Sequence, residues 1–246
     1  MLFRSKLSNL HLVSTAKARE RVVKLGEVPG LVVVTGCPSI DIAADVAANP
    51  ALDFDPFGKY GGVGPRADLS DGYLVVMQHP VTTEYDEARR QVDETLYAVK
   101  DMGLPVLWFW PNVDAGSDGT SKGIRVFREK EKAENFHLFR NMHPEDFLRL
   151  LMHSTAIVGN SSVAIRECSF LGVPAVNIGS RQQGRERGPN VIDVEHDRHA
   201  ISAAISAHKA NGKAPSDHLY GDGQAGKRIA ACLATQEFTI EKRLTY

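Results

Sequence analysis

The sequence predicts an α/β protein built on a parallel sheet, because short apolar runs alternate with helix-like stretches along the chain. The apolar runs lack the apolar–polar alternation of a sheet with one wet face, so both faces should be buried. Hydrophobic residues make up 43% and charged residues 24% of the 246 residues, which is ordinary for a globular protein with a core. We therefore expect a Rossmann-like parallel sheet with helices on both faces.

The expected strands are short runs of apolar, mostly β-branched or aromatic residues. Glycine, proline or polar residues bound each run, as Gly30 and Gly36 do on either side of the first. In chain order the expected strands are residues 31–34, 73–77, 106–109, 136–139, 156–158, 174–178 and 191–194.

The expected helices show apolar residues at helical spacing or a clear start and stop signal. Val92, Leu96 and Val99 share one face of a charged stretch that ends at Gly103. Pro144 opens another helix, with acidic residues in its positively polarised first turn. In chain order the expected helices are residues 84–102, 121–132, 144–153, 162–171, 198–210 and 224–234. Residues 53–72, rich in glycine and proline, are expected to form a flexible loop or lid.

Composition excludes several classes of function. Lys plus Arg total 29 against 30 Asp plus Glu, so the net charge of −1 argues against a nucleic-acid or anionic-lipid surface. No apolar run approaches the roughly 18 residues of a membrane span, and charges at Arg4 and Lys6 make a poor signal peptide. The odd number of widely spaced cysteines fits no zinc site and favours a cytoplasmic setting. We expect no metal and no cofactor.

Polar residues follow most of the predicted strands. Ligands of open parallel sheets bind beyond the carboxyl ends of the strands, so these residues are the candidates for a site. His79 follows one strand directly and is a good candidate by position. The segments that share this placement are residues 36–39, 79–83, 111–117, 141–143, 159–162 and 179–185.

Gly159-Asn160-Ser161-Ser162 lies between a predicted strand and a predicted helix. Free backbone N–H groups and the helix dipole favour an anion at such a point, and the serine hydroxyls add donors. Simple N-capping without a ligand explains the same residues equally well. Glu167, five residues on, is able to accept the two hydroxyls of a ribose, although a solvated helix glutamate is the commoner case.

Arg181, Arg185 and Arg187 fall in one loop after a strand. Guanidinium forks suit phosphate oxygens, and a solvated loop is the alternative. Together with the Ser-Ser turn, they favour a diphosphate pocket.

The remaining signals are weak. The glycines at 61–64 lack the lysine and hydroxyl of a P-loop. His196 and His199 have no evident third metal ligand, and His11 alone reads as a core histidine on a short strand.

These motifs together resemble the UDP-N-acetylglucosamine 2-epimerases, and most of all the hydrolysing branch, which feeds sialic-acid-type sugar synthesis. The resemblance is carried by residues 159–185, from Gly159-Asn-Ser-Ser through Arg181-Gln-Gln-Gly-Arg. Further motifs match in the same order, namely residues 7–11, 36–39, 78–83, 110–117 and 220–223.

The resemblance implies a lobe equivalent to the C-terminal lobe of a two-lobed GT-B fold, which binds UDP. Residues 31–235 would form this lobe, after a remnant of the N-terminal lobe and hinge at 1–30 and before a tail at 236–246.

Ser161 and Ser162 would hold the diphosphate and Glu167 the ribose, with His79 also at the substrate. Asn112 and Met142 would lie near the uridine. Arg181 and the catalytic residue His11 would face the phosphate and sugar. Ala164 departs from the glycine usual in the family.

The implied reaction removes UDP from C1 and a proton from C2 of UDP-N-acetylglucosamine or a related UDP-sugar. Water then adds to the resulting glycal. The carboxylates for proton removal belong to an N-terminal lobe that this sequence does not contain, so a missing lobe or a homo-oligomer partner is expected. A non-catalytic UDP-binding lobe, a non-hydrolysing epimerase and a GT-B glycosyltransferase remain the alternatives.

Overall fold

The computed structural model describes residues 2–112, 114–237 and 241–242. The chain forms two compact units, one of Met1–Ala48 with His218–Tyr246 and the other of Asn49–Asp217. These bounds differ from the predicted division at residues 30 and 235, because the strand at 32–34 and the last helix pack within the first unit. Of the predicted tail, residues 238–240 and 243–246 lie outside the described residues.

The second unit is built on a six-stranded sheet in which every pairing is parallel, as predicted. Its spatial order is β5-β4-β3-β6-β7-β8. Counted from β3, this is the 3-2-1-4-5-6 order of nucleotide-binding Rossmann sheets. The strands are β3 (Leu74–Met77), β4 (Val106–Phe109), β5 (Phe136–Phe139), β6 (Ala156–Gly159), β7 (Ala175–Ile178) and β8 (Val191–Val194).

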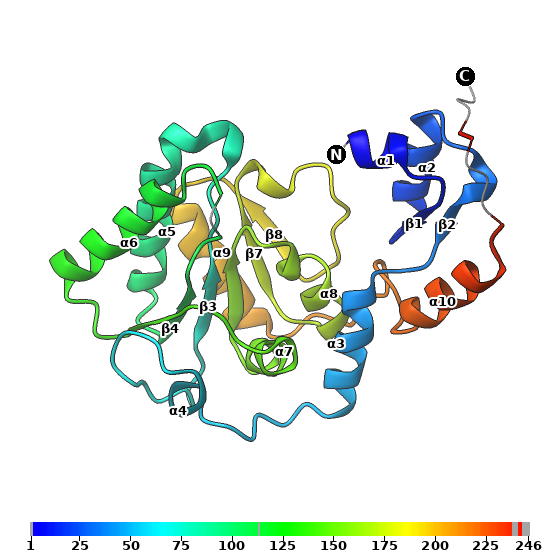
Figure 1. Ribbon diagram of the computed structural model, residues 1–246. Coiled ribbons are helices and arrows are strands. Elements are labelled where there is room, and N and C mark those ends of the chain that lie inside the picture. Colours follow the sequence, from blue (N-terminus) through cyan, green and yellow to red (C-terminus); the bar gives the residue numbers. More distant parts are fainter. Residues whose placement is uncertain (1, 113, 238–240, 243–246) are drawn as a thin grey trace. The chain divides into compact units, whose positions relative to one another are not determined.

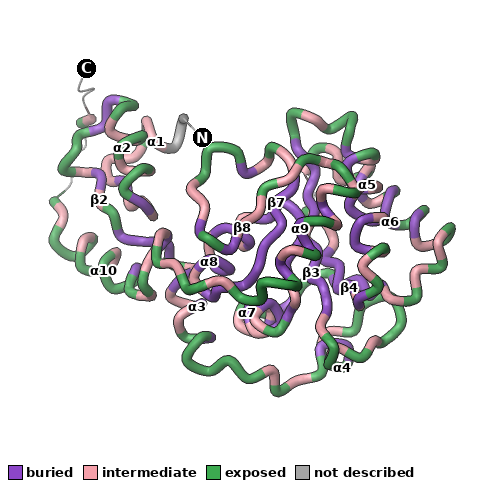
Figure 2. Tube along the Cα trace, turned by 180° about the vertical axis from the view of Figure 1, so that it is seen from behind, coloured by how far each residue is buried: buried purple, intermediate pink, exposed green. Residues whose placement is uncertain are grey.

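One face of this sheet carries the main hydrophobic core. In register, Val76 lies opposite Trp108 on one side and Val158 on the other, and all three are fully buried. Figure 2 shows the buried residues running along the strands, with exposed residues on the outer helices. Three long helices supply the other half of the core (Figure 1), namely α5 (Ala88–Asp101), α6 (Ser117–Glu131) and α9 (Arg198–Asn211).

Shorter helices cover the opposite face. The Phe109 ring packs edge-on against Phe147 at 4.8 Å between centroids, which seats α7 (Pro144–Met152) on the sheet. Phe57, from α4 (Pro56–Tyr60), packs edge-on against His137 and stacks on Phe139, both of the edge strand. The last helix of this group is α8 (Glu167–Leu171). The sheet is therefore covered on both faces, as a parallel sheet requires.

The glycine-rich segment within residues 53–72 is attached to the sheet. Val63 and Leu138 exchange two backbone hydrogen bonds of 2.9 Å, so the segment covers the free edge of β5. The His137 ring lies between the carbonyl oxygens of Gly61 and Pro65, at 2.8 and 3.0 Å. A Cβ at Gly64 would lie 2.3 Å from the Phe136 oxygen. Gly64 thus permits close backbone approach, where the sequence alone indicated only flexibility.

The first unit has its own two-stranded parallel sheet, formed by β1 (His11–Val13) and β2 (Val32–Val34). The predicted strand at 31–34 is therefore real, but it does not join the large sheet and only Val32 is buried. The helices of this unit are α1 (Leu2–Leu7), α2 (Ala16–Lys24), α3 (Pro38–Ala48) and α10 (Ala225–Thr235).

Two of the sequence motifs meet inside the first unit. The Cys37 N–H donates to the Tyr220 carbonyl at 2.8 Å. A Cβ at Gly36, whose φ is +87°, would lie 3.3 Å from the Gly221 Cα. The Asp41 carboxylate accepts hydrogen bonds from the Ala225 and Gly226 N–H groups and so caps α10. Gly36 and Gly221 are explained by this close approach of two backbones.

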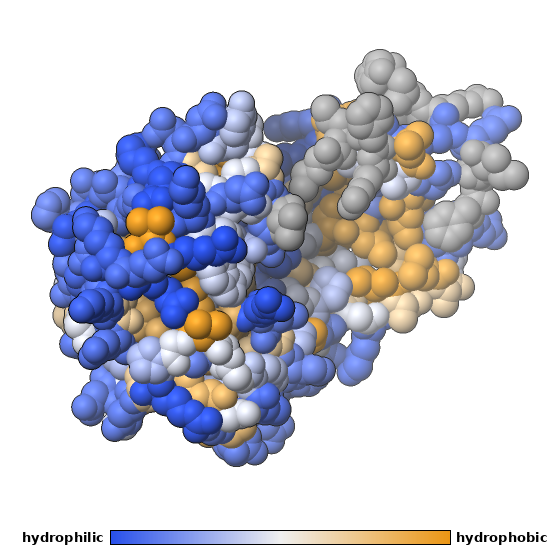
Figure 3. Space-filling model, turned by 60° about the vertical axis from the view of Figure 1, so that its left-hand side comes forward, coloured by the Kyte–Doolittle hydropathy of each residue, from blue (hydrophilic) through white to orange (hydrophobic). Residues whose placement is uncertain are grey.

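Apolar surface remains exposed on the first unit. Leu7 is 79% and Leu233 52% exposed, and Figure 3 shows apolar side chains gathered over this part of the chain. None of the helices in the described part of the chain combines the length and the apolar character needed to cross a bilayer.

Candidate functional site

The switch point of the large sheet lies between β3 and β6, where successive connections leave toward opposite edges. Such a point opens a crevice beyond the carboxyl ends of the strands. His79 follows β3 and Asn160 follows β6. The Asn160 Oδ1 accepts from the His79 N–H and the Asn160 Nδ2 donates to the His79 carbonyl, each at 2.8 Å. The two loops are thus joined side by side at the crevice.

Asn160 also holds the loop that follows β7. Its main-chain carbonyl accepts hydrogen bonds from Arg181 Nη1 at 3.1 Å and from Gln182 Nε2 at 2.7 Å. Asn160 is fully buried. Sequence reasoning treated this residue as part of a turn and missed its central place, although its position directly after a strand was the available signal.

Arg181 faces a cavity of about 510 Å³ at this edge. The guanidinium lies 3.9 Å from the Asp114 carboxylate, and burial lowers the pKa of Arg181 while Asp114 opposes the change. Arginine stays charged under any such shift, so the cavity presents a partly desolvated cation. It is lined by Pro80, Val81, Thr82, Thr83, Glu84, Asp114, Ser180, Arg181 and Gln183.

The other two arginines of the predicted pocket have different surroundings. Arg187 forms a bidentate pair with Asp193 at 3.0 and 3.1 Å and donates to the carbonyls of Gln182 and Arg185. It therefore braces the loop from within. Arg185 is exposed. Of the three guanidinium groups, only that of Arg181 lines the cavity.

Ser161 and Ser162 begin a 3-10 turn, Ser162–Ala164, and not the continuous helix predicted over 162–171. Residues 165–166 form a turn, and α8 starts only at Glu167. The Asn190 Nδ2 donates to the Ala164 carbonyl at 3.1 Å, which occupies an oxygen that a continuous helix would use internally. The helix-dipole argument for anion binding is correspondingly weakened, because so short a turn carries little macrodipole. The donors that remain are the hydroxyls and local N–H groups.

Glu167 is the first residue of α8 and is 6% exposed. One oxygen lies 3.4 Å from Arg166 Nη2, whereas Oε2 is buried with no hydrogen-bond partner among the described residues. A solvated surface glutamate, the commoner alternative, is therefore excluded. Buried carboxylate oxygens are normally hydrogen-bonded. Oε2 is therefore able to accept hydrogen bonds from a bound ligand.

Three further predicted residues lie along the same edge. His79 is 4% exposed, and its Nδ1 accepts from the Asn112 N–H at 3.2 Å. Asn112 itself is exposed, whereas Met142, after β5, is buried. The buried His79 ring thus holds the main chain of Asn112 in place through this hydrogen bond. The direct roles of these residues in binding remain predictions.

His79 makes the stability of the second unit depend on pH. Burial, helped by Arg181 and opposed by Asp114, lowers the pKa of His79 from 6.5 to about 4. A folded-state pKa below the unfolded value means that the unfolded chain binds the proton more tightly, so stability falls as the pH drops below 6.5. Between pH 7 and pH 5 we expect His79 to account for about 2 kcal/mol of lost stability.

The measurement is denaturant unfolding followed by tryptophan fluorescence. In a His79→Asn variant the loss on acidification should shrink by that amount. His143→Asn, which changes a histidine whose side chain is 74% exposed, should behave as the native chain does. Equal pH dependence in all three proteins would contradict the assignment to His79.

His11 lies on β1 in the first unit. It is buried, as a core histidine would be, and its Nε2 lies 3.0 Å from the Glu27 carboxylate. Lys242 Nζ lies 2.7 Å from the same carboxylate. Burial pushes the pKa of Glu27 upward, but the hydrogen bonds from Lys242 and His11 outweigh it and hold that pKa below 4.5. Neither Glu27 nor Lys242 carried a signal in the sequence. The catalytic role of His11 remains a prediction.

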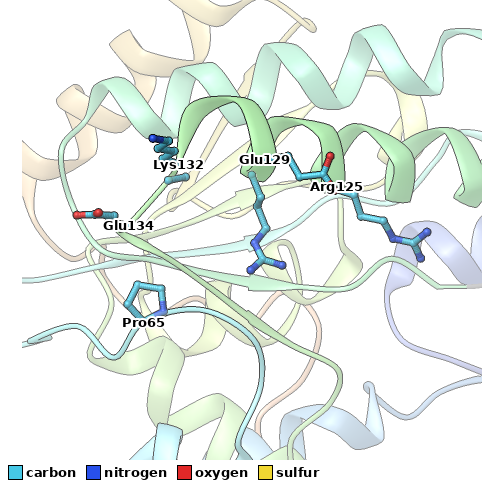
Figure 4. Close-up of a pocket in the computed structure, with 7 residues that line it drawn as sticks. Pro65, Arg125, Glu129, Lys132 and Glu134 are labelled. Atoms are coloured by element: carbon cyan, nitrogen blue, oxygen red, sulfur yellow. The ribbon is translucent and has the colours of Figure 1, made fainter.

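A larger cavity, of about 720 Å³, lies at the C-terminal end of α6 (Figure 4). It is lined by residues of α6, by the turn at Lys132–Glu134 and by Pro65. This turn leads into β5, so the cavity lies at the amino ends of the strands. Ligands of parallel sheets bind at the opposite edge, and we therefore assign the site to the smaller cavity. Among the described residues, no group of three or more His, Cys, Asp or Glu is placed to hold a metal ion.

Comparison with known proteins agrees with this geometry. The profile of the family described as UDP-N-acetylglucosamine 2-epimerase matches residues 3–234. The chain belongs to this family. The UDP-N-acetylglucosamine 2-epimerase of Neisseria meningitidis serogroup B is 31% identical over 219 residues, covering 89% of this chain and 55% of that protein. The UDP-N,N'-diacetylbacillosamine 2-epimerase (hydrolyzing) of Legionella pneumophila is 28% identical over 94% of this chain and 59% of its own length.

Solved structures of the family share the fold. The Methanocaldococcus jannaschii UDP-GlcNAc 2-epimerase, crystallised with UDP-GlcNAc and UDP, superposes with a TM-score of 0.71 at 14% identity. The match covers 93% of this chain and 62% of that one. The family members of known structure thus have the GT-B-type architecture expected for this chain. The chain spans about half the length of the curated relatives it matches.

Proposed function

We propose that this chain carries the nucleotide-binding part of a hydrolysing UDP-N-acetylglucosamine 2-epimerase and that the second unit binds UDP at the β3–β6 switch point. Arg181, Ser161 and Ser162 would contact the diphosphate. Glu167 would accept the ribose hydroxyls, with Asn112 and Met142 beside the uracil and His79 beneath them. The substrate would be UDP-N-acetylglucosamine or a related UDP-sugar.

One observation carries the proposal. Glu167 Oε2 is buried at the start of α8 with no partner among the described residues. The two hydroxyls of a ribose are neutral donors of the kind such an oxygen lacks, and a charge-assisted hydrogen bond is worth about 1.5–3 kcal/mol. The cation of Arg181, in the cavity at the same edge of the sheet, suits a diphosphate.

The proposed reaction breaks the C1–O bond to UDP while the C2 proton is removed, and water then adds to the glycal. Cationic and N–H donors that stabilise the departing diphosphate lower the barrier to this step, and Arg181 would supply the charge. The hydrolysing assignment is supported by the Legionella relative, whose name states that activity. We place the carboxylates for proton removal on a lobe outside this chain, and His11 would act beside them. The spacing of the cysteines supports a reducing, cytoplasmic setting.

Calorimetry with UDP and a turnover assay test the proposal. We expect this chain to bind UDP and, with UDP-N-acetylglucosamine, to release no N-acetylmannosamine. Adding the N-terminal half of a relative as a separate polypeptide should restore release of UDP and N-acetylmannosamine. Release of the epimerised UDP-sugar instead would assign the non-hydrolysing reaction. Turnover by the chain alone would contradict the placement of the carboxylates, and absence of UDP binding would overturn the site.

A further inference from the structure

His196 is a buried histidine that the proposed site does not use. It follows β8, in the short connection to α9. Both ring nitrogens are buried, and among the described residues neither makes a hydrogen bond of normal geometry, although the Gln91 backbone lies near enough to act on the ring. Buried polar groups in folded proteins are nearly always hydrogen-bonded, so a buried ring without a well-formed hydrogen bond requires an explanation.

The ring packs against Gly179, the residue that leads out of β7. A Cβ at Gly179 would lie 2.3 Å from His196 Nε2 and 2.8 Å from Cδ2. The ring therefore occupies the space of a side chain at that position. Gly179 has a φ of +70° and opens the turn Ser180–Gln182. This turn carries Arg181, so the imidazole packs against the start of the turn that positions Arg181.

Glu84 makes a second contact with the same turn. Its carboxylate accepts a hydrogen bond from Ser180 Oγ and another, of 2.6 Å, from Gln91 Nε2. The Ser180 bond is the main reason why the pKa of Glu84 lies below its usual 4.5. Glu84 also lines the cavity that Arg181 faces. The turn is thus held by contacts with both an ionised carboxylate and an imidazole.

The charges around His196 come from three elements. Burial lowers its pKa below 6.5, so the ring is neutral at pH 7. Glu84, Glu195 and the backbone of Gln91 favour the protonated ring, whereas Arg90 on α5 opposes it. A proton on the ring would therefore find its strongest attraction in Glu84, the group that Ser180 now contacts.

We propose that His196 is a positioning residue for the nucleotide site. The neutral ring supports the Ser180–Gln182 turn and thereby aims Arg181. Protonation of the ring draws Glu84 from Ser180 into an ion pair and releases the turn. The proposal rests on UDP binding at this site, and it makes that binding weaken in acid.

Calorimetric titration with UDP at pH 7.5 and pH 5.5 tests the effect on binding. The native chain should lose at least about fivefold more affinity on acidification than His196→Gln, whose side chain does not titrate. The ionisation of UDP itself is common to both proteins. His208→Gln is the matched control, because His208 is also buried with a lowered pKa but contacts the Ala175 carbonyl at the start of β7. It should retain the native pH dependence.

Amide hydrogen exchange of the free protein tests the turn without UDP. The Gly179 N–H bonds to the Val194 carbonyl and the Gln183 N–H to the Ser180 carbonyl, each at 2.8 Å. After correction for the intrinsic rate, acidification should reduce protection of both amides in the native chain but not in His196→Gln. Equal protection in the two proteins would overturn the inference. Failure to bind UDP with the exchange pattern as expected would instead overturn only the proposed function.

Discussion

Replacing Glu167 with glutamine is expected to weaken UDP binding by roughly 10- to 100-fold. The change keeps the shape of the side chain but removes the charge from Oε2, the buried oxygen that has no partner among the described residues. A hydrogen bond to a charged group contributes about 1.5–3 kcal/mol, and each 1.4 kcal/mol is a factor of ten in affinity. Isothermal titration calorimetry of native chain and variant gives the ratio directly.

The ligand offers an independent check on the same contact. 2',3'-Dideoxy-UDP should bind the native chain more weakly than UDP, and the Glu167→Gln variant should distinguish the two nucleotides much less. Glu129→Gln, at an exposed glutamate of α6 distant in sequence, should leave the affinity unchanged. If Glu167→Gln binds UDP with native affinity, Glu167 has no role at the ribose.

Replacing Asn160 with alanine is expected to lower the free energy of unfolding of the second unit by about 2–4 kcal/mol. The variant leaves the N–H and the carbonyl of His79 without their side-chain partner in a fully buried place. Each unpaired buried polar group costs about 1–3 kcal/mol. Because the loop after β7 binds the main chain of Asn160, the variant should also bind UDP more weakly.

Tryptophan fluorescence isolates this unit during denaturant unfolding. The two tryptophans of the sequence, Trp108 and Trp110, both lie in the second unit. Asn211→Ala, at an exposed asparagine that ends α9, should change the unfolding free energy by no more than about 0.5 kcal/mol. An Asn160→Ala variant as stable as this control would show that the two hydrogen bonds contribute nothing.

The strands were the most predictable part of the fold. Strands β4, β5 and β8 begin and end where the sequence predicts, because an apolar run between polar or glycine boundaries is a local signal. The start of α6 was predicted four residues late. Glycine and aspartate around Gly116 look like a loop, whereas the structure uses Gly116, at a φ of +91°, as the N-cap of the helix.

Contacts distant in sequence explain the other differences. No residue at 162–171 predicts a break in the helix. At the break, Asn190, 26 residues away, donates a hydrogen bond to the Ala164 carbonyl. Gly64 approaches β5 too closely for a side chain at that position. His137, 76 residues from Gly61, holds the glycine-rich segment. Local patterns carry no information on such pairs.

The sequence by itself determined the parallel α/β class, the order of the strands and helices along the chain and the polar residues that follow the strands. These features depend on periodicity and on turn residues, which act over a few neighbouring positions. Only the tertiary structure decided which strands are neighbours. It placed β3 beside β6, so that His79 and Asn160, 81 residues apart, share two hydrogen bonds at the switch point. It also buried Glu167 and seated Gly179 on His196, because burial and unmet hydrogen bonds are properties of the packed chain alone.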